Sequence, residues 1–267
     1  MSSTQRIIKY LATAFAIFLV VTIIFGVINA VFSLGNLFDD SNQSHKKLEG
    51  ININEDVSVL DIDVKSVKII FKEGEKLLAK TNNKNINVRQ DRNKLFITQK
   101  QTNWFNNDNN ELIIYIPKEF TFDGVSINAG AGNVTIDELL ANMFYLEVGA
   151  GKVEIEKLTV LNSTEIDGGA GKMVINNGSL NNLDLDMGVG QVTLNALITG
   201  RSQIDCGVGS VDLNLIGNIN DYKIGLDKGI GSAILDGESM KDDTYYGTGE
   251  NFIDIDGGIG SIKINFN

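Results

Sequence analysis

Apolar and polar residues alternate with a period of two through most of the chain from residue 48 onward. This is the pattern of strands that bury one face. From residue 125 the alternation is interrupted by triplets in which an apolar residue stands between two glycines. Their first glycines are separated by 19, 20, 19, 19, 22 and 29 residues, a nearly fixed period typical of stacked supersecondary units. The seven first glycines are Gly130, Gly149, Gly169, Gly188, Gly207, Gly229 and Gly258.

The phase of the alternation changes at each triplet. Before the fourth triplet an apolar residue, Leu185, precedes an acidic one, Asp186; after it, apolar residues return at Val192 and Leu194. With Val189 also pointing inward, the spacing of inward residues becomes three instead of two. The chain must then turn a corner, and glycine adopts the backbone conformations that a corner needs at little cost. Each repeat is therefore expected to be a strand, a corner, a strand and a return.

The repeats contain no helical periodicity, so we predict an all-β fold. The expected architecture is a β-solenoid, a single-stranded β-helix-like stack of 19–20-residue coils with Gly-x-Gly corners, each coil about 4.8 Å from the next. Residues 125–267 would form the regular repeats. Residues 48–124 alternate without triplets and are expected to form irregular β coils or a small sheet, which would shield the first regular coil from edge pairing.

An apolar segment near the N-terminus predicts one membrane span. Tyr10 to Ile28 contain no charged residue, and about 20 residues are needed for a helix to cross a bilayer core. Basic residues precede the segment and acidic residues follow it, which places the N-terminus in the cytoplasm and the repeats outside. The alternative is a signal peptide cleaved near Ala30, although the apolar run is longer than is usual for one. The predicted segments are a cytoplasmic tail (1–9), a transmembrane signal-anchor helix (10–33) and a polar linker (34–47).

The segment Leu112–Phe120, followed by Val125–Ile136 and its repeated copies, resembles the DUF4097 family of bacterial β-strand-repeat proteins, which are candidate adhesins. The resemblance extends over roughly residues 46–267 and depends on the whole array of triplets. It implies a β-solenoid ectodomain in the bacterial envelope, often encoded beside envelope-stress genes, with no assigned catalytic activity. It transfers no site residues to this chain.

The net charge of the chain is −11, and residues 1–38 contain only Arg6 and Lys9 as charged residues, so the remainder carries −13. Nucleic-acid binding needs a basic surface, which makes a nucleic-acid partner unexpected. An acidic exterior is typical of a soluble surface that repels other copies of itself. The charge pattern leaves the oligomeric state open.

Two segments depart from the repeat pattern and are candidate contact loops. One, residues 101–110, contains Trp104 and Phe105; the other, residues 237–249, contains Tyr245 and Tyr246. Aromatic residues beside Asn and Asp suit the binding of an envelope protein or a glycan. The alternative is that both segments are ordinary loops whose aromatic rings pack against the stack.

An acidic column raises the question of a bound cation. Asp167, Asp186 and Asp205 recur two residues before their triplets, and like charges on adjacent strands destabilise a sheet. Calcium would relieve this repulsion, because it prefers several oxygen ligands. The calcium-binding nonapeptide pattern is not met, since Met173 and Ile262 stand where its Asp would be. A solvated, salt-screened face is the alternative, and no other cofactor is expected.

The sequence contains no convincing catalytic set. Cys206 falls in an inward column and has no nearby histidine, so we expect it to be buried and unreactive. Asp184 and Asp186 resemble the paired carboxylates of polysaccharide-cleaving solenoids, but Gln203 stands in the column of Asp184 one coil later. Lys228 falls in the same inward column as Cys206 and breaks its apolar pattern.

The sequence therefore predicts a membrane-anchored extracytoplasmic β-solenoid that acts as a non-catalytic, adhesin-like binding or structural module of the bacterial cell envelope. Two other functions stay open. One is an accessory protein of an envelope-stress response, and the other is a carbohydrate-active β-helix enzyme.

Overall fold

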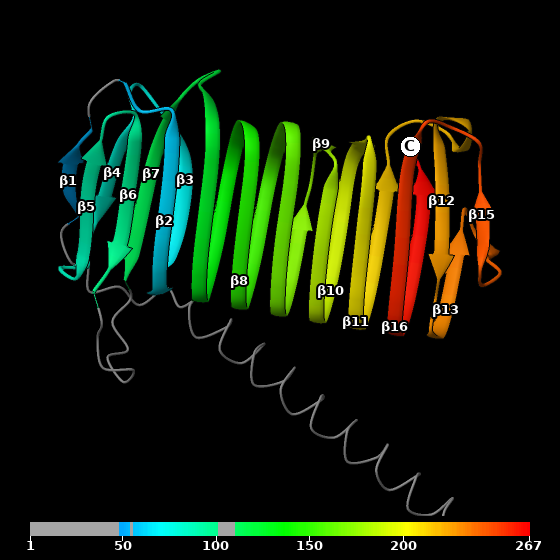
Figure 1. Cartoon of the computed structure of the whole chain (residues 1–267). Helices are drawn as coiled ribbons and strands as arrows, with labels where there is room; N and C mark the ends of the chain where they lie inside the picture. Colours follow the sequence, from blue (N-terminus) through cyan, green and yellow to red (C-terminus); the bar gives the residue numbers. More distant parts are fainter. Residues whose placement is uncertain (1–47, 54–55, 101–109) are drawn as a thin grey trace, which may run out of the picture.

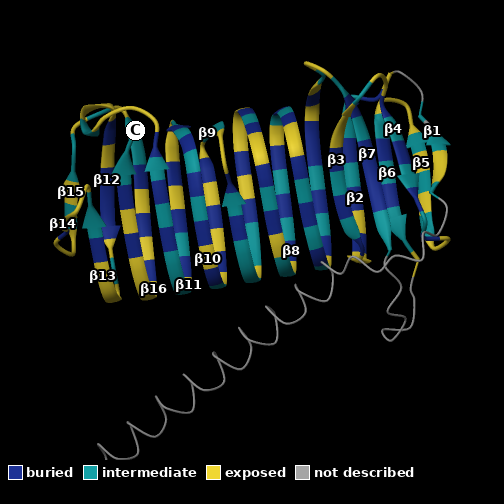
Figure 2. Ribbon diagram, turned by 180° about the vertical axis from the view of Figure 1, so that it is seen from behind, coloured by how far each residue is buried: buried dark blue, intermediate teal, exposed yellow. Residues whose placement is uncertain are grey.

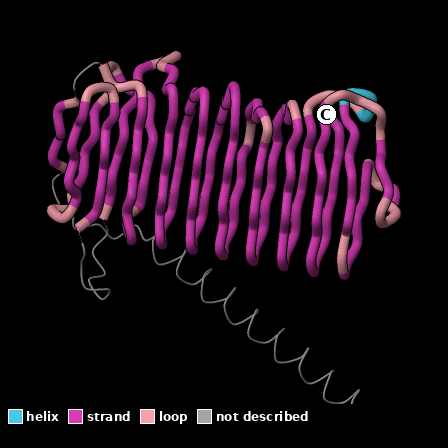
Figure 3. The backbone as a smooth tube through the Cα atoms, viewed as in Figure 1, coloured by secondary structure: helices cyan, strands magenta, loops and turns pink. Residues whose placement is uncertain are grey.

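The computed structural model describes residues 48–53, 56–100 and 110–267. Over these residues the only helix is a three-residue 3₁₀ turn, η1 (Ile219–Asp221), and the all-β class is confirmed (Figure 3). The strands are β1 (Glu49–Asn52), β2 (Val59–Ser66), β3 (Lys68–Gly74), β4 (Leu78–Thr81), β5 (Ile86–Asp91), β6 (Lys94–Gln99), β7 (Glu111–Pro117), β8 (Thr121–Ile175), β9 (Gly178–Asn181), β10 (Leu183–Thr199), β11 (Arg201–Leu215), β12 (Tyr222–Asp227), β13 (Ile230–Leu235), β14 (Glu238–Ser239), β15 (Thr244–Tyr246) and β16 (Asn251–Phe266).

The strands form rungs that stand side by side in one stack (Figure 1). A triplet-containing rung consists of a strand, a glycine corner and a second strand, and β8, β10, β11 and β16 run through their corners without a break. Neighbouring rungs pair in parallel and in register: Val189 lies beside Val208, and Val208 lies beside Ile259. The glycine triplets of these rungs therefore lie directly beside one another.

The third residue of the triplet needs to be glycine for two reasons. In six of the seven triplets its φ lies between +139° and +157°, a range that residues with a side chain rarely adopt. The stack also leaves no room for a side chain, because a Cβ on Gly209 would lie 1.7 Å from the carbonyl oxygen of Gly190 in the adjacent rung. The repeated glycine therefore permits both the corner and the close approach of the rungs.

The middle residue of the triplet does not point into the core, contrary to the expectation from the sequence. Ile230 is 73% exposed and Ile259 is 46% exposed, and Val189 is only half-buried. The buried residues that flank this corner are Met187 and Val192. The glycine with positive φ redirects the backbone, so the triplet runs across the outside of the corner and its middle side chain is left partly in solvent.

The spatial order of the rungs differs from the chain order at the C-terminal end. β16 pairs in parallel with β11 on one side and with β12 and β13 on the other. The seventh triplet therefore lies between the fifth and the sixth, and the C-terminus lies inside the stack and not at its end (Figure 1). From β8 onward, each coil lies on the preceding one only as far as β11. After β11 the chain forms the rung of β12 and β13 two positions away and leaves one position empty. Residues 236–250 then cover the end of that rung, and β16 inserts between it and β11.

The N-terminal end has a related arrangement. The rung made of β2 and β3 lies between the first triplet-containing part of β8 and the rung made of β6 and β7. Beyond it, β5 and β4 pair antiparallel with β6 and β7, and β1 pairs with β4. The strands without triplets thus belong to the same stack as the repeats.

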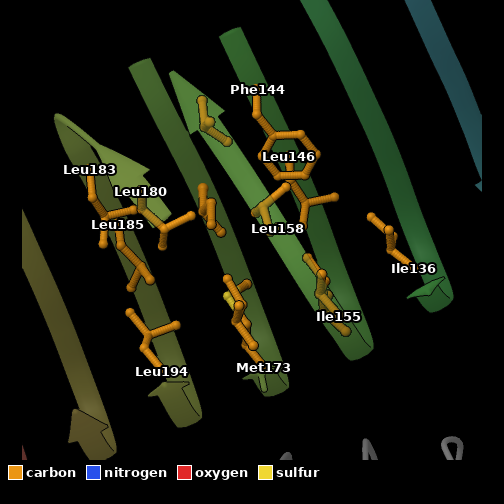
Figure 4. Packing of buried hydrophobic residues seen from close by; sticks show 14 of the residues in the cluster. Ile136, Phe144, Leu146, Ile155, Leu158, Met173, Leu180, Leu183, Leu185 and Leu194 are labelled. Atoms are coloured by element: carbon orange, nitrogen blue, oxygen red, sulfur yellow. The ribbon is translucent and has the colours of Figure 1, made fainter. Parts of the chain in front are cut away.

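One apolar core runs through the stack between the strands on the two sides of the corner (Figure 2). Buried side chains of consecutive rungs contact one another along it, among them Leu146, Ile155, Leu185 and Leu194 (Figure 4). Every rung adds side chains to a core that its neighbours share, so stability depends mainly on contacts between adjacent rungs.

The predicted cytoplasmic tail, transmembrane helix and polar linker lie outside the described residues. In the part of the chain that the structure covers, helical structure is too short to span a membrane.

Candidate binding groove

A shallow groove with a volume of about 390 Å³ lies on the outer surface of the strands that precede the corner. Residues at equivalent positions of adjacent rungs line it, and β16 contributes because it lies beside β11: Arg201 is next to Phe252, and Gln203 is next to Asp254. The side chains that give the groove its chemistry are three carboxylates, two amides, one guanidinium and one aromatic ring. They belong to Glu165, Asp184, Asp254, Asn182, Gln203, Arg201 and Phe252.

Hydrogen bonds fix the shape of the groove from below. The hydroxyl of Ser202 is buried and accepts a hydrogen bond from the backbone N–H of Leu183 at 3.0 Å. The side chain of Asn182 donates to the backbone carbonyl of Asn162 at 2.8 Å and accepts from the backbone N–H of Arg201 at 3.1 Å. These bonds link three successive rungs, so the groove is held by the same contacts that hold the stack.

A row of cationic and aromatic side chains borders the groove. The Arg201 guanidinium lies 4.8 Å from the centroid of the Phe252 ring, and the Lys223 ammonium lies 4.8 Å from that of Tyr245. The two ring centroids are 6.2 Å apart. Each cation is attracted to the electron-rich face of its ring, which orders long side chains that would otherwise be mobile. We call Arg201, Phe252, Lys223 and Tyr245 the cation–aromatic row.

A column of aspartates runs beside the groove, toward the corner. Five of them lie in register on five adjacent rungs, and we call them the aspartate ladder. In spatial order they are Asp167, Asp186, Asp205, Asp256 and Asp227. Partial burial, followed by the nearby charges of Asp205, Asp184 and Asp167, raises the pKa of Asp186. The pKa of Asp256 is raised in the same way, by partial burial and then by Asp227, Asp205 and Asp254.

This surface keeps its negative charge uncompensated. Over residues 48–53, 56–100 and 110–267, the ion pairs within 4.0 Å involve other carboxylates, and neither the ladder nor the three groove carboxylates takes part in one. The nearby cations, Arg201 and Lys223, lie over aromatic rings instead. A ligand that brings positive charge or hydrogen-bond donors would therefore be favoured here.

The calcium candidates Asp167, Asp186 and Asp205 stand on three successive rungs. Within the described ranges, groups of three or more His, Cys, Asp or Glu side chains placed to hold a metal ion are absent. Calcium binding by these three residues stays a prediction from the sequence.

Asp186→Asn is expected to stabilise the protein at pH 7. The pKa of Asp186 is higher in the folded state than its ordinary value, so the folded state takes up the proton more readily than the unfolded chain does. The unfavourable contribution of the charged residue is thus complete above the raised pKa and disappears as the pH falls through it. We expect a gain of up to about 1 kcal/mol in the free energy of unfolding at neutral pH, vanishing near pH 4.

Urea unfolding of the wild type and the variant at both pH values measures this difference. Asp212→Asn is the matched control, since the neighbours of Asp212 on the adjacent rungs are Thr193 and Lys263. A gain from Asp186→Asn that is equal at both pH values, or that the control reproduces, would contradict the explanation by charge repulsion.

The structure separates the predicted contact residues. Trp104 and Phe105 lie outside the described residues. Tyr245 is 61% exposed and belongs to the cation–aromatic row. Tyr246 is half-buried against the core, and its hydroxyl accepts a hydrogen bond from the backbone N–H of Lys241. The segment 237–249 covers the end of the last rung, where Met240 is buried, so it is not a free loop.

Two other sequence observations have simple structural explanations. Cys206 is 6% exposed, and burial raises the pKa of its thiol, so the expected buried cysteine is confirmed. Lys228 lies on the last triplet-containing rung, where the inward column ends, and is half-buried. Its backbone N–H donates to the carboxylate of Asp242 at 2.8 Å.

Most of the groove could not be recognised from the sequence alone. Arg201 and Phe252 stand six residues before their triplets, and in the corresponding column of the second to fourth triplets stand Met143, Ser163 and Asn182. In this column the neutral residues give way to an arginine and an aromatic residue, and this change was the one sign of the groove in the sequence. It becomes meaningful only when the two rungs are known to be neighbours.

Comparisons with known proteins give one family and several solved structures. Similar solved structures include a candidate cell adhesion protein from Clostridium sporogenes, which is 16% identical, with 83% of this chain and 99% of that chain covered and a TM-score of 0.36. A candidate adhesin from Bacteroides fragilis is 17% identical, with 84% and 100% covered and a TM-score of 0.41. A comparison with curated proteins gives no match. The family model described as Toastrack DUF4097 matches residues 51–249, so the resemblance seen in the sequence is confirmed and the chain belongs to the DUF4097 (Toastrack) family.

Proposed function

We propose that this protein is a non-catalytic, adhesin-like binding module of the bacterial cell envelope, held outside the cell membrane by a single N-terminal anchor. The observation that carries the proposal is the groove on the outer face, whose polar side chains come from adjacent rungs and are set by the rigid stack. Binding sites built on regular strands are held more accurately than sites on loops. A rigid surface of this kind suits recognition.

The arrangement of the carboxylates supports binding over catalysis. Asp184 and Asp186 both lie on the outer face of β10, and Asp184 is paired in register with Gln203 of the next rung. A glycosidase needs two carboxylates on opposite sides of the bond that it breaks, one of them protonated. Here the acidic residues recur along one face, as parts of the repeat.

The membrane anchor is supported by the apolar, uncharged segment from Tyr10 to Ile28 and by the basic residues before it. In intact bacteria that express the full chain, trypsin added outside should release the stack by cleavage at Lys46 or Lys47 in the linker. Recovery of the intact chain in the soluble cytoplasmic fraction would refute the anchor.

The full-length chain is expected to retain a component of the bacterial envelope, and Arg201→Gln should weaken this binding about tenfold. A hydrogen bond from a charged donor contributes about 1.5–3 kcal/mol, and tenfold corresponds to about 1.4 kcal/mol. Retention of cell-wall and membrane fractions on the immobilised chain measures the binding.

Lys263→Gln is the control for this experiment. Lys263 is exposed on β16 beyond the corner, so its removal changes the net charge equally but leaves the groove intact. If neither fraction is retained, the binding function is wrong. If both variants reduce retention equally, binding depends on net charge and not on the groove.

A further inference from the structure

The groove has the chemistry of a site for a cationic sugar. Its walls carry the carboxylates of Glu165, Asp184 and Asp254, all of them exposed. Carboxylates accept several hydrogen bonds each, and they bind ammonium groups and hydroxyl groups alike. The amide of Gln203 adds another planar polar group, although it already donates to Asp205 at 2.9 Å. A ligand with many hydroxyl groups and some positive charges would satisfy these acceptors.

The electrostatic surroundings select for positive charge. The aspartate ladder lies one side-chain position away from the groove, and the charge of Asp184 on the groove wall contributes to the raised pKa of Asp186. The groove and the ladder therefore share one negative field, without a lysine or arginine within 4.0 Å of their carboxylates in the described part of the chain. Binding a cation would relieve repulsion that is already present in the folded protein.

The neighbouring aromatic side chain suits a sugar ring. Tyr245 extends beyond the groove at the end of the cation–aromatic row and is 61% exposed. Aromatic side chains combine a large apolar surface with a polar end, which allows contact with the C–H face of a sugar ring. Only Gly225 of β12 lies between Asp254 of the groove and Tyr245 of β15. The Tyr245 ring is 6.2 Å from the Phe252 ring of the groove, so one extended ligand could reach both the groove and Tyr245.

A peptide is less well matched to this surface. Peptides commonly bind by adding a strand to a free sheet edge or by placing apolar side chains in a groove. β10, β11 and β16 are paired on both sides beneath the groove, so no free edge is available there. The side chains that line the groove are mostly polar, so apolar anchors would find few partners.

We propose that the groove binds a glycan whose hexosamine units carry free, protonated amino groups. The inference rests on the proposed binding function and specifies the ligand class of the same site. Asp184 and Asp254 bind the ammonium groups, Glu165 and Gln203 accept hydrogen bonds from hydroxyl groups, Arg201 donates to hydroxyl or ring oxygens of a neighbouring sugar, and Tyr245 contacts a sugar ring. N-acetylation removes the positive charge and should weaken binding.

The test uses the full-length chain in detergent and two probes that differ only in acetylation: a glucosamine hexasaccharide and its fully N-acetylated counterpart. Calorimetric titration at pH 6 and low salt is expected to show at least tenfold tighter binding of the free amine. The double variant Asp184→Asn, Asp254→Asn should lose at least tenfold in affinity for the amine probe. Asp212→Asn should bind as the wild type does, and thermal melting confirms that each variant is folded.

Three results would overturn the proposal: equal affinity for both hexasaccharides, unchanged binding by the folded double variant, or equally tight binding of a lysine hexapeptide. Equally tight binding of the lysine hexapeptide would show that this surface binds polycations in general and does not recognise a sugar. If neither sugar binds while envelope fractions are still retained by a mechanism sensitive to Arg201→Gln, the ligand class is wrong and the binding function stands. If envelope fractions are not retained either, both are wrong.

Discussion

Gly209→Ala is expected to destabilise the stack by at least about 4 kcal/mol, an unusually large effect for one methyl group. The φ of Gly209 is +145°, and its added Cβ would lie 1.7 Å from the carbonyl oxygen of Gly190. Because the obstacle is backbone and not a flexible side chain, the two rungs must separate. Gly209 also pairs in register with Gly260, so the disturbance extends to β16.

Substitutions at two other glycines separate the cost of the positive φ from the cost of the contact between rungs. Gly237 has a φ of +87° with no atom within 4 Å of the added Cβ, so Gly237→Ala tests the backbone conformation alone, which costs roughly 1–2 kcal/mol. Gly124 lacks a positive φ, and its added Cβ would meet only the end of Met143 at 4.0 Å, so Gly124→Ala should be nearly neutral. Urea unfolding of the three variants should give losses in the order Gly209, Gly237, Gly124. A loss for Gly209→Ala no larger than for Gly237→Ala would show that the contact between rungs does not require glycine.

Local sequence patterns were sufficient to predict the stacked rungs. The alternation of residues such as Leu185 and Asp186 depends only on which face of a strand is buried, and the triplets recur because each corner needs glycine. The position of Val189 was assigned wrongly because a residue beside a glycine with positive φ no longer follows the alternation. Its half-exposed side chain reflects the backbone of the next residue, Gly190, whose φ is +153°.

The order of the last rungs could not be predicted from the pattern. The triplets that begin at Gly229 and Gly258 have the same form, and either could have followed β11. The longer spacings before them indicate a departure from the repeat but do not give its direction. The choice depends on how residues 236–250 cover the end of the stack, which is a matter of tertiary packing.

The groove was missed for the same reason. Arg201 and Phe252 are far apart in the sequence and become neighbours only because β16 lies against β11. Tyr245 could be recognised, because it stands in a segment that breaks the repeat. Residues on the regular face of a strand give no such signal, even where a change of chemistry along one column creates a site.

The position of β16 gives the C-terminal strand a large share of the stability. Its buried residues Ile253, Ile255, Ile262 and Ile264 fill the core between β11 and the last rung. Burying one such side chain contributes about 1.5–3 kcal/mol, so the four together contribute roughly 6–12 kcal/mol. This is comparable with the whole stability of a typical domain. Without β16, β12 and β13 would keep only their short antiparallel partners β15 and β14 and would have no strand joining them to the rest of the stack.

Truncation after Glu250 is therefore expected to unfold the C-terminal end and to lower the thermal midpoint by more than about 10 °C. Amide hydrogens of β12 to β15 should exchange at the rate of an unfolded chain, while β8 stays protected, because each rung contacts only its neighbours. The exposed edge of β11 would favour aggregation.

Adding a synthetic peptide of residues 251–267 to the truncated chain should restore protection of these amide hydrogens, since the gap that the peptide fills is defined by strands on both sides. Lys263→Ser is the control, because the outward side chain of Lys263 leaves the core of β16 intact and should change stability by less than about 0.5 kcal/mol. Full protection of β12 and β13 in the truncated chain would mean that the last rung can pair directly with β11, and that the inserted strand is not what holds this end of the stack together.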